Sequence, residues 1–130
     1  MPTIFTRIVR GEIPCHKLWE DDRFFALLDI KPSQPGQSLV IPKREIDSPF
    51  DMDDDEYSAF LRAAKNLIEP IRRAMGSKKV GLVIEGLEVP HAHIKLIPIS
   101  HALDISAPGV DATDEELAAV VEKIKKEIHH

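Results

Sequence analysis

The sequence has one cysteine, no long apolar run and no excess of basic residues. Because Cys15 has no possible partner in the chain, an intramolecular disulfide framework is excluded and a reducing compartment is favoured. No segment reaches the ~18 consecutive apolar residues of a membrane helix. The first residues also lack the apolar stretch of a secretory signal. We therefore expect a cytoplasmic protein with no membrane partner.

The charge balance argues against a general nucleic-acid binder. Lys and Arg number 17 against 22 Asp and Glu, which gives a formal net charge of −5. A basic field is what such binders present. A small phosphorylated ligand is not excluded, because local charge decides its binding. With 130 residues, 43% of them hydrophobic, we expect a single domain over residues 1–130. His129 and His130 have the look of a purification-tag remnant and receive no role.

One short segment, residues 89–98, carries the most chemical information. Within it, His91, His93 and Lys95 alternate with apolar residues. A period of two predicts a strand with these three side chains on one face, roughly 6.6–7 Å apart. A row of imidazole and ammonium groups suits an anion such as phosphate.

Two other interpretations of this segment stay open on the pattern alone. The row is also compatible with the ordinary solvated face of a strand. A His-x-His pair on a strand can instead hold a metal ion, but further ligands would then have to come from His16, His101 or Cys15. We expect no metal site and no cofactor.

Periodicity and turn residues predict the other elements. Pro70 lies inside the long helical pattern and is expected to kink or locally break it. The predicted elements are a short helix at 3–10, strands at 16–20, 23–29, 37–43 and 79–85, a long helix at about 53–75 with an acidic start, the His-rich strand, and a final helix at about 113–128 with a capping box. This pattern predicts an α+β fold in which helices cover one face of an antiparallel sheet of about five strands.

Four segments resemble the histidine-triad (HIT) superfamily, and within it the Hint-like branch. They are residues 4–8 with 11–14, 21–32, 39–43 and 91–97. The resemblance covers a core of about residues 3–101 and implies a HIT-like fold. Residues 102–128 then form a C-terminal extension that contains the last helix.

The resemblance implies specific roles. His93 is the middle histidine, which attacks the α-phosphorus of a nucleotide and forms a nucleotidyl-histidine intermediate. The backbone at His91 orients it, and Asp29 binds the ribose hydroxyls. Lys95 stands where the family has its third histidine. It keeps a positive charge for phosphoryl oxygens but is a poor proton donor and acceptor near neutral pH, since its ordinary pKa is ~10.4. The implied base pocket is Ile4, Phe5, Ile8, Leu28, Ile30 and Leu39, with Gln37 at a polar position of the third strand.

The chain departs from the family pattern at several other places. Ile84 replaces an asparagine that contacts the phosphate or leaving-group side. The loop at 86–90 is short and carries Glu88. Thr3 and Thr6 stand where some members have a zinc-binding Cys-x-x-Cys, so we predict no zinc.

Three functional hypotheses follow. The first is a nucleotidyl hydrolase or transferase that cleaves a purine nucleoside phosphoramidate or a related phosphoanhydride through His93. The second is a nucleotide-binding module with little or no turnover, and the third a structural dimer with an empty pocket. The resemblance also implies a homodimer that pairs through the long helix and a central strand. The sequence leaves the base, the leaving group and the role of the last helix undecided.

Overall fold

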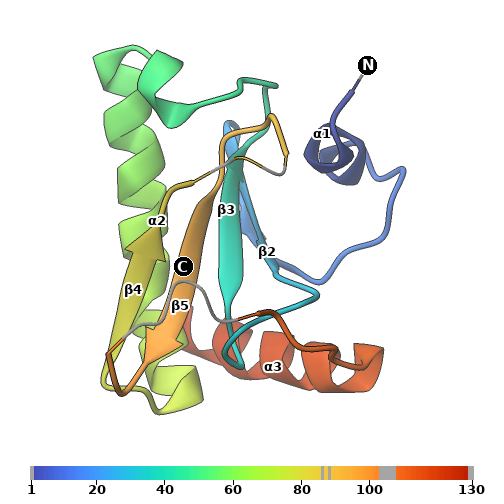
Figure 1. The fold of residues 1–130 in the computed structure, drawn as a ribbon, viewed down its shortest axis with the longest axis vertical. Helices are drawn as coiled ribbons and strands as arrows, with labels where there is room; N and C mark the ends of the chain where they lie inside the picture. The colour runs from blue at the N-terminus through green and yellow to red at the C-terminus, as the bar shows by residue number, and fades with distance from the viewer. Residues whose placement is uncertain (1, 86, 88, 103–107, 129–130) are drawn as a thin grey trace.

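A five-stranded antiparallel sheet forms the centre of the molecule (Figure 1). The structure is a computed structural model that describes residues 2–85, 87, 89–102 and 108–128. The strands lie in the order β1-β2-β3-β5-β4, and every neighbouring pair is antiparallel. The elements are α1 (Ile4–Val9), β1 (Lys17–Glu20), β2 (Phe24–Leu28), β3 (Ser38–Pro42), a 3₁₀ turn η1 (Pro49–Asp51), α2 (Asp54–Met75), β4 (Lys79–Val83), β5 (Ile94–Ile99) and α3 (Asp114–Glu127).

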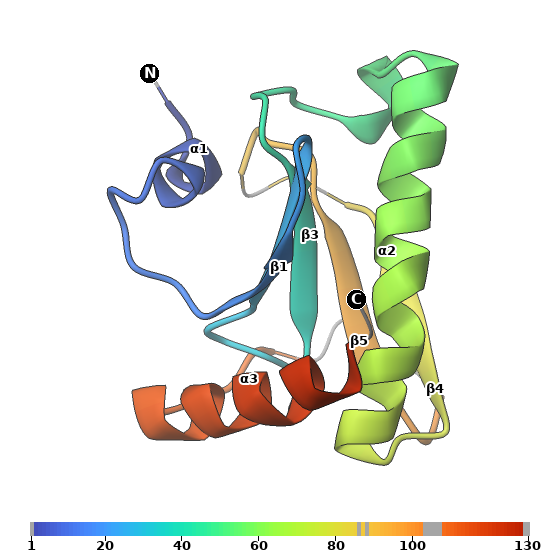
Figure 2. The ribbon, with the colours of Figure 1, turned by 180° about the vertical axis from the view of Figure 1, so that it is seen from behind.

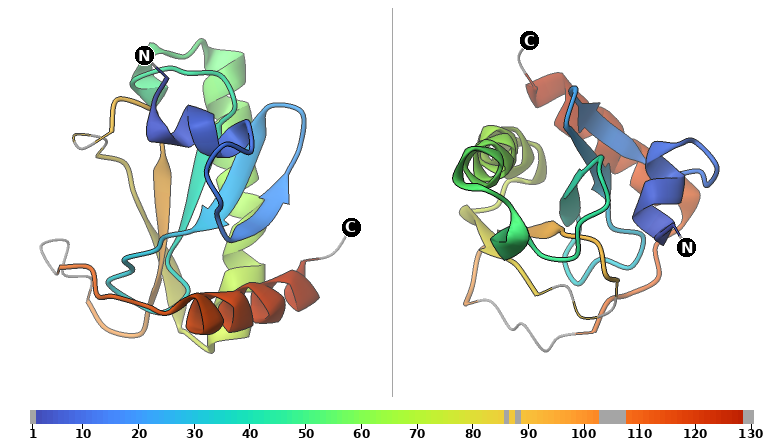
Figure 3. Two further views of the ribbon diagram at one scale, coloured as in Figure 1. Left: turned by 90° about the vertical axis from the view of Figure 1, so that its right-hand side faces the viewer. Right: turned by 90° about the horizontal axis from the view of Figure 1, so that it is seen from above.

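Helices cover both faces of the sheet, so the prediction of one covered face was wrong. Figures 2 and 3 show α1 and α2 on opposite sides of it. All five residues of β2 are buried, and they alternate between the two sides. Phe24 and Ala26 pack into the core beneath α2, whereas Phe25 and Leu27 pack with α1. A strand that is apolar at every position needs cover on both faces.

α1 is short and its start is fixed by a threonine. The Thr3 hydroxyl caps the helix by accepting a hydrogen bond from the Thr6 backbone N–H at 3.1 Å. The helix ends before Gly11, whose φ of +80° suits glycine. Phe5 and Ile8 are buried and anchor the helix on the sheet.

α2 is continuous from Asp54 to Met75, which matches the predicted range of about 53–75. Asp53 caps its first turn, and Gly76, with a φ of +65°, ends it. The helix continues through Pro70, so the predicted local break does not occur, and the alternative of a kink stays a prediction. Pro70 removes one backbone donor, and it is buried one turn after Leu67, where it lines a cavity together with Trp19 and Ile128. The helix therefore accommodates the missing hydrogen bond at this buried position.

α3 confirms the predicted capping box and crosses one end of the sheet beside α2 and β1 (Figure 3). The Thr113 hydroxyl accepts from the Glu116 N–H, and the Glu116 carboxylate accepts from the Thr113 N–H. Leu117, Val121 and Ile124 are buried in the α2-side core. Part of the loop predicted before this helix, residues 103–107, lies outside the described residues, as do His129 and His130.

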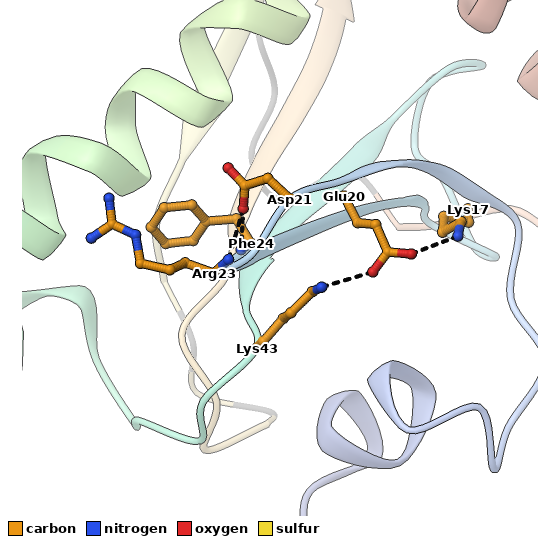
Figure 4. Close-up of polar contacts among 6 residues, drawn as sticks. All are labelled: Lys17, Glu20, Asp21, Arg23, Phe24 and Lys43. Carbon is orange, nitrogen blue, oxygen red and sulfur yellow. Dashed lines mark hydrogen bonds and ion pairs between the residues drawn. The ribbon is translucent and has the colours of Figure 1, made fainter.

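A small ion-pair group ties the edge strand β1 to the end of β3 (Figure 4). The Lys17 and Lys43 ammonium groups lie 2.7 and 2.8 Å from the Glu20 carboxylate oxygens. Hydrogen bonds from both lysines lower the pKa of Glu20 to about 2. Because Lys17 and Glu20 are exposed and Lys43 is partly exposed, the group adds little to stability. No helix of the described chain is both long and apolar enough to span a membrane.

The α2-side core predicts a large difference between two phenylalanines. Phe60 is fully buried and stacks on Phe24 with ring centroids 5.4 Å apart, whereas Phe50 is 71% exposed. Phe60→Ala should lower the free energy of unfolding by about 3–5 kcal/mol because it leaves a cavity. Phe50→Ala should change it by less than about 0.5 kcal/mol. Urea denaturation measures both, and equal losses would contradict the core described here.

Candidate functional site

A cavity of about 260 Å³ lies between α1 and the sheet. Its walls are mostly apolar and come from α1, from the segment after it, and from β2 and β3. Four lining residues are charged or titratable near neutral pH: Asp29, Glu85, His93 and Lys95. A mostly apolar cavity with a few polar groups is typical of a small-molecule site.

His91 and His93 lie just before β5 and not inside it, because the strand begins at Ile94. The ladder between β3 and β5 ends at the pair Val40 and Ile94. Beyond this pair, the Ala92 N–H donates to the Ile46 carbonyl at 2.7 Å, so the backbone leaves the sheet. The alternation of side chains nevertheless persists across the strand start. Ala92, Ile94 and Leu96 are buried in the α2-side core, whereas His93 and Lys95 line the cavity.

His93 is only 7% exposed and held in one orientation. Its Nδ1 lies 2.8 Å from the backbone oxygen of His91. Since a carbonyl only accepts, Nδ1 must carry the proton and donate it. In the neutral ring Nε2 then keeps its lone pair, and no side chain among the described residues is hydrogen-bonded to it. The Phe5 ring contacts the imidazole edge-on at 5.3 Å. This burial excludes an ordinary solvated strand face.

His91 does not line the cavity and is completely buried behind it. Its Nε2 lies 2.8 Å from the Pro42 carbonyl and its Nδ1 lies 2.7 Å from the Thr3 hydroxyl. Nε2 therefore donates to Pro42, and Nδ1 of the neutral ring accepts from Thr3. Burial lowers the pKa of His91, and the Pro42 hydrogen bond and the charge of Glu45 only partly oppose this.

Asp29 follows β2 directly and presents its carboxylate at the cavity. The Lys31 backbone N–H donates to its Oδ1 at 3.0 Å, and the Gln37 amide donates to its Oδ2 at 2.9 Å. The Ser33 hydroxyl in turn donates to the Gln37 amide oxygen at 2.6 Å. Gln37 is not among the lining residues, and it orients Asp29 from behind.

The structure brings most of the sequence-predicted site together. All six apolar residues predicted to enclose the base line the cavity: Ile4, Phe5, Ile8, Leu28, Ile30 and Leu39. The sequence reasoning missed seven further lining residues, which are Ile13, Pro14, Cys15, Leu27, Glu85, Leu87 and Val89. Most of these belong to irregular segments, where no periodicity shows which way a side chain points. Burial raises the pKa of the Cys15 thiol.

Two departures from the family pattern, Ile84 and the loop at 86–90, can be compared with the structure. Ile84 packs with the α2-side core and is not among the lining residues, while its neighbour Glu85 is. Gly86 and Glu88 lie outside the described residues. Among the described residues no group of three or more His, Cys, Asp and Glu side chains is arranged to hold a metal ion. The absence of a zinc site stays a prediction.

The chain belongs to the HIT domain family, whose model matches residues 10–102. An uncharacterized HIT-like protein of Methanocaldococcus jannaschii is 35% identical over 73% of this chain and 77% of its own length. The adenosine 5'-monophosphoramidase of Schizosaccharomyces pombe is 31% identical over 98% of this chain and 99% of its own. The crystal structure of a HIT-like protein from Bartonella henselae has a TM-score of 0.85 at 25% identity, over 96% of this chain and 95% of the other. The predicted HIT-like α+β fold is thus confirmed.

The burial of His91 predicts how it titrates. In an unfolded chain the imidazole takes up a proton below about pH 6.5, but in the folded protein its pKa is lower. Stability should therefore fall as the pH drops from about 6.5 toward the folded pKa of His91, because only the unfolded state binds the proton. NMR titration with labelled histidine measures this pKa, and His91→Asn assigns the signal. A midpoint at or above 6.5 would contradict the buried, neutral ring.

Proposed function

We propose that the protein binds a purine nucleoside monophosphate unit in this cavity and cleaves a phosphoramidate, or a related phosphoanhydride, through His93. The observation that carries the proposal is the state of His93. It lines the cavity with Nδ1 bonded to the His91 carbonyl, so Nε2 is left as a nucleophile. The similarity to the adenosine 5'-monophosphoramidase of Schizosaccharomyces pombe supports the same chemistry.

In this proposal the apolar walls enclose the base and Asp29 accepts hydrogen bonds from the ribose hydroxyls. Phe5 and Ile8 of α1 and Leu27 and Leu39 of the sheet line the cavity and belong to one apolar cluster. These side chains offer contact area without a charge to desolvate. Asp29 already receives two hydrogen bonds, and an ionised carboxylate has about four acceptor sites. Capacity therefore remains for hydroxyl donors.

The reaction proceeds in two displacements. First, Nε2 of His93 attacks the α-phosphorus, the P–N bond to the amine breaks, and the departing amine takes the electron pair and a proton from solvent. Second, water attacks phosphorus, the P–Nε2 bond breaks, and the water proton passes to solvent. The ring gains positive charge in the first step, so its Nδ1–H donates more strongly to the His91 carbonyl. Lys95 places an ammonium group toward the phosphoryl oxygens.

The alternative is a nucleotide-binding module with little turnover. The observation that favours it is Glu85, which lines the same cavity as Lys95 and His93. A carboxylate close to a phosphoryl group repels its oxygens and also competes for the lysine charge. Steady-state turnover by the wild-type protein distinguishes the enzyme from the binding module.

Substitution of His93 tests the enzyme directly. His93→Ala should lower turnover of adenosine 5'-phosphoramidate by on the order of 10³-fold or more, because the nucleophile is lost. AMP binding, measured by calorimetry, should change by only a few-fold. His101→Ala is the matched control, since His101 is exposed after β5, and it should keep full activity. A wild type without turnover would favour the binding module, and an active His93→Ala would place the nucleophile elsewhere.

We also propose a homodimer. The resemblance implies pairing through the long helix and a central strand, and we place the edge strand β4, which contacts α2, at the interface in place of a central strand. β4 is an edge strand, and Leu82 on it leaves 40% of its surface exposed. A second copy would cover this edge. Sedimentation of the wild type should give a dimer, and Leu82→Lys should shift it toward monomer. A monomeric wild type at micromolar concentration would contradict the assembly.

A further inference from the structure

Four side chains from distant parts of the chain meet behind the cavity in one hydrogen-bonded cluster, which we call the α1 clasp: Thr3, Thr6, Glu45 and His91. Thr3 and Thr6 belong to the start of α1, Glu45 follows β3, and His91 precedes β5. Glu45 Oε1 lies 2.7 Å from the Thr3 backbone nitrogen and 2.8 Å from the Thr6 hydroxyl. The Thr3 hydroxyl lies 2.7 Å from His91 Nδ1. The clasp therefore joins α1 to both segments that flank the cavity.

The distances within the clasp indicate which atom donates and which accepts in each hydrogen bond. The Pro42 carbonyl requires a proton on His91 Nε2, so Nδ1 of the neutral ring accepts from the Thr3 hydroxyl. The Thr6 hydroxyl then donates to Glu45. The longer distances from the Thr6 hydroxyl to Thr3 and to His91, 3.2 and 3.4 Å, are weaker alternatives. Hydrogen bonds from the Thr3 backbone and the Thr6 hydroxyl lower the pKa of Glu45, which fits an ionised acceptor.

The clasp reaches the proposed nucleophile through a single atom, the backbone oxygen of His91. This oxygen accepts from His93 Nδ1 at 2.8 Å. Both ends of His91 are held, its ring by Thr3 and Pro42 and its carbonyl by His93. The ring of Phe5, one turn into α1, lies edge-on to both imidazoles, with centroids 5.7 Å and 5.3 Å away. A shift of α1 would therefore move the cavity wall and the nucleophile together.

We propose that the α1 clasp is a positioning device that holds the His91 carbonyl in place and so keeps His93 in its Nδ1–H tautomer with Nε2 toward the cavity. Its members are positioning residues, because they do not line the cavity themselves. The inference rests on the proposed function for its effect on catalysis. Its effect on the tautomer of His93 does not depend on that function.

Two threonines with the same capping role allow a matched test. Thr3 caps α1 and Thr113 caps α3, each by accepting a hydrogen bond from a backbone N–H three residues later. Thr3→Val and Thr113→Val both keep the side-chain shape and remove one cap. Only Thr3→Val also removes the donor to His91. Both variants lose a helix cap, and Thr3→Val should lose further stability because His91 Nδ1 is left without its donor. An effect on the His93 tautomer should appear only in Thr3→Val.

The expected result is that Thr3→Val lowers kcat for adenosine 5'-phosphoramidate by on the order of 10-fold or more, as misplacement of a reacting group does. Thr3→Ser should restore kcat to within about two-fold, since it keeps the hydroxyl. Thr113→Val should leave kcat unchanged. Equal kcat in the two valine variants, or a kcat of Thr3→Ser as low as that of Thr3→Val, would overturn the proposal. The clasp would then only stabilise the fold.

Nitrogen-15 NMR of the histidine rings provides a second readout that needs no turnover. In the wild type the His93 signals should show the Nδ1–H tautomer alone, and in Thr3→Val a mixture of tautomers. If the wild type is inactive but this change appears, the proposed function fails and the clasp stands. If the wild type is active but Thr3→Val keeps a single His93 tautomer, the clasp fails and the function stands.

Discussion

The arrangement of the site depends on one hydrogen bond, from Nδ1 of His93 to the backbone oxygen of His91. It exists because the β3–β5 ladder ends at Ile94, which leaves the His91 carbonyl outside the sheet and free to accept from a side chain. The bond fixes which nitrogen of His93 keeps a lone pair. His91 itself is held by Pro42 and Thr3, so contacts outside the cavity hold the residue whose carbonyl accepts from the proposed nucleophile.

The two faces of the sheet differ, because one carries the larger core and the other carries the cavity of the proposed site. On one face α2 and α3 complete a large core that includes Phe24, Phe60 and Ile124. On the other face the short helix α1 packs only partly against the sheet and leaves the cavity between them. β2 and β3 are buried on both sides and connect the two regions. Substitutions beneath α2 should therefore act mainly on folding, and substitutions beneath α1 on the ligand.

The sequence predicted the parts of this structure that carry a local signal. Alternation placed Ala92 and Ile94 opposite His93, an acidic start marked the long helix, and a capping box marked the final helix. Patterns within one element could not reveal which face α1 covers, nor that Glu45 meets Thr3 across 42 positions of the chain. Most of the missed lining residues, such as Ile13 and Val89, lie in irregular segments without periodicity. Propensity likewise predicted a kink or a local break at Pro70, and the helix continues without a break through this buried residue.

The central claim is that Nε2 of His93 forms a covalent bond to phosphorus during turnover. Rapid quenching of the wild-type protein with adenosine 5'-phosphoramidate, followed by peptide mass spectrometry, tests it most directly. An adenylyl group is expected on the peptide that contains His93, located on that residue by fragmentation and formed as fast as the product. Full turnover with an unmodified His93 peptide at every time point, or with the adduct on another residue, would contradict it.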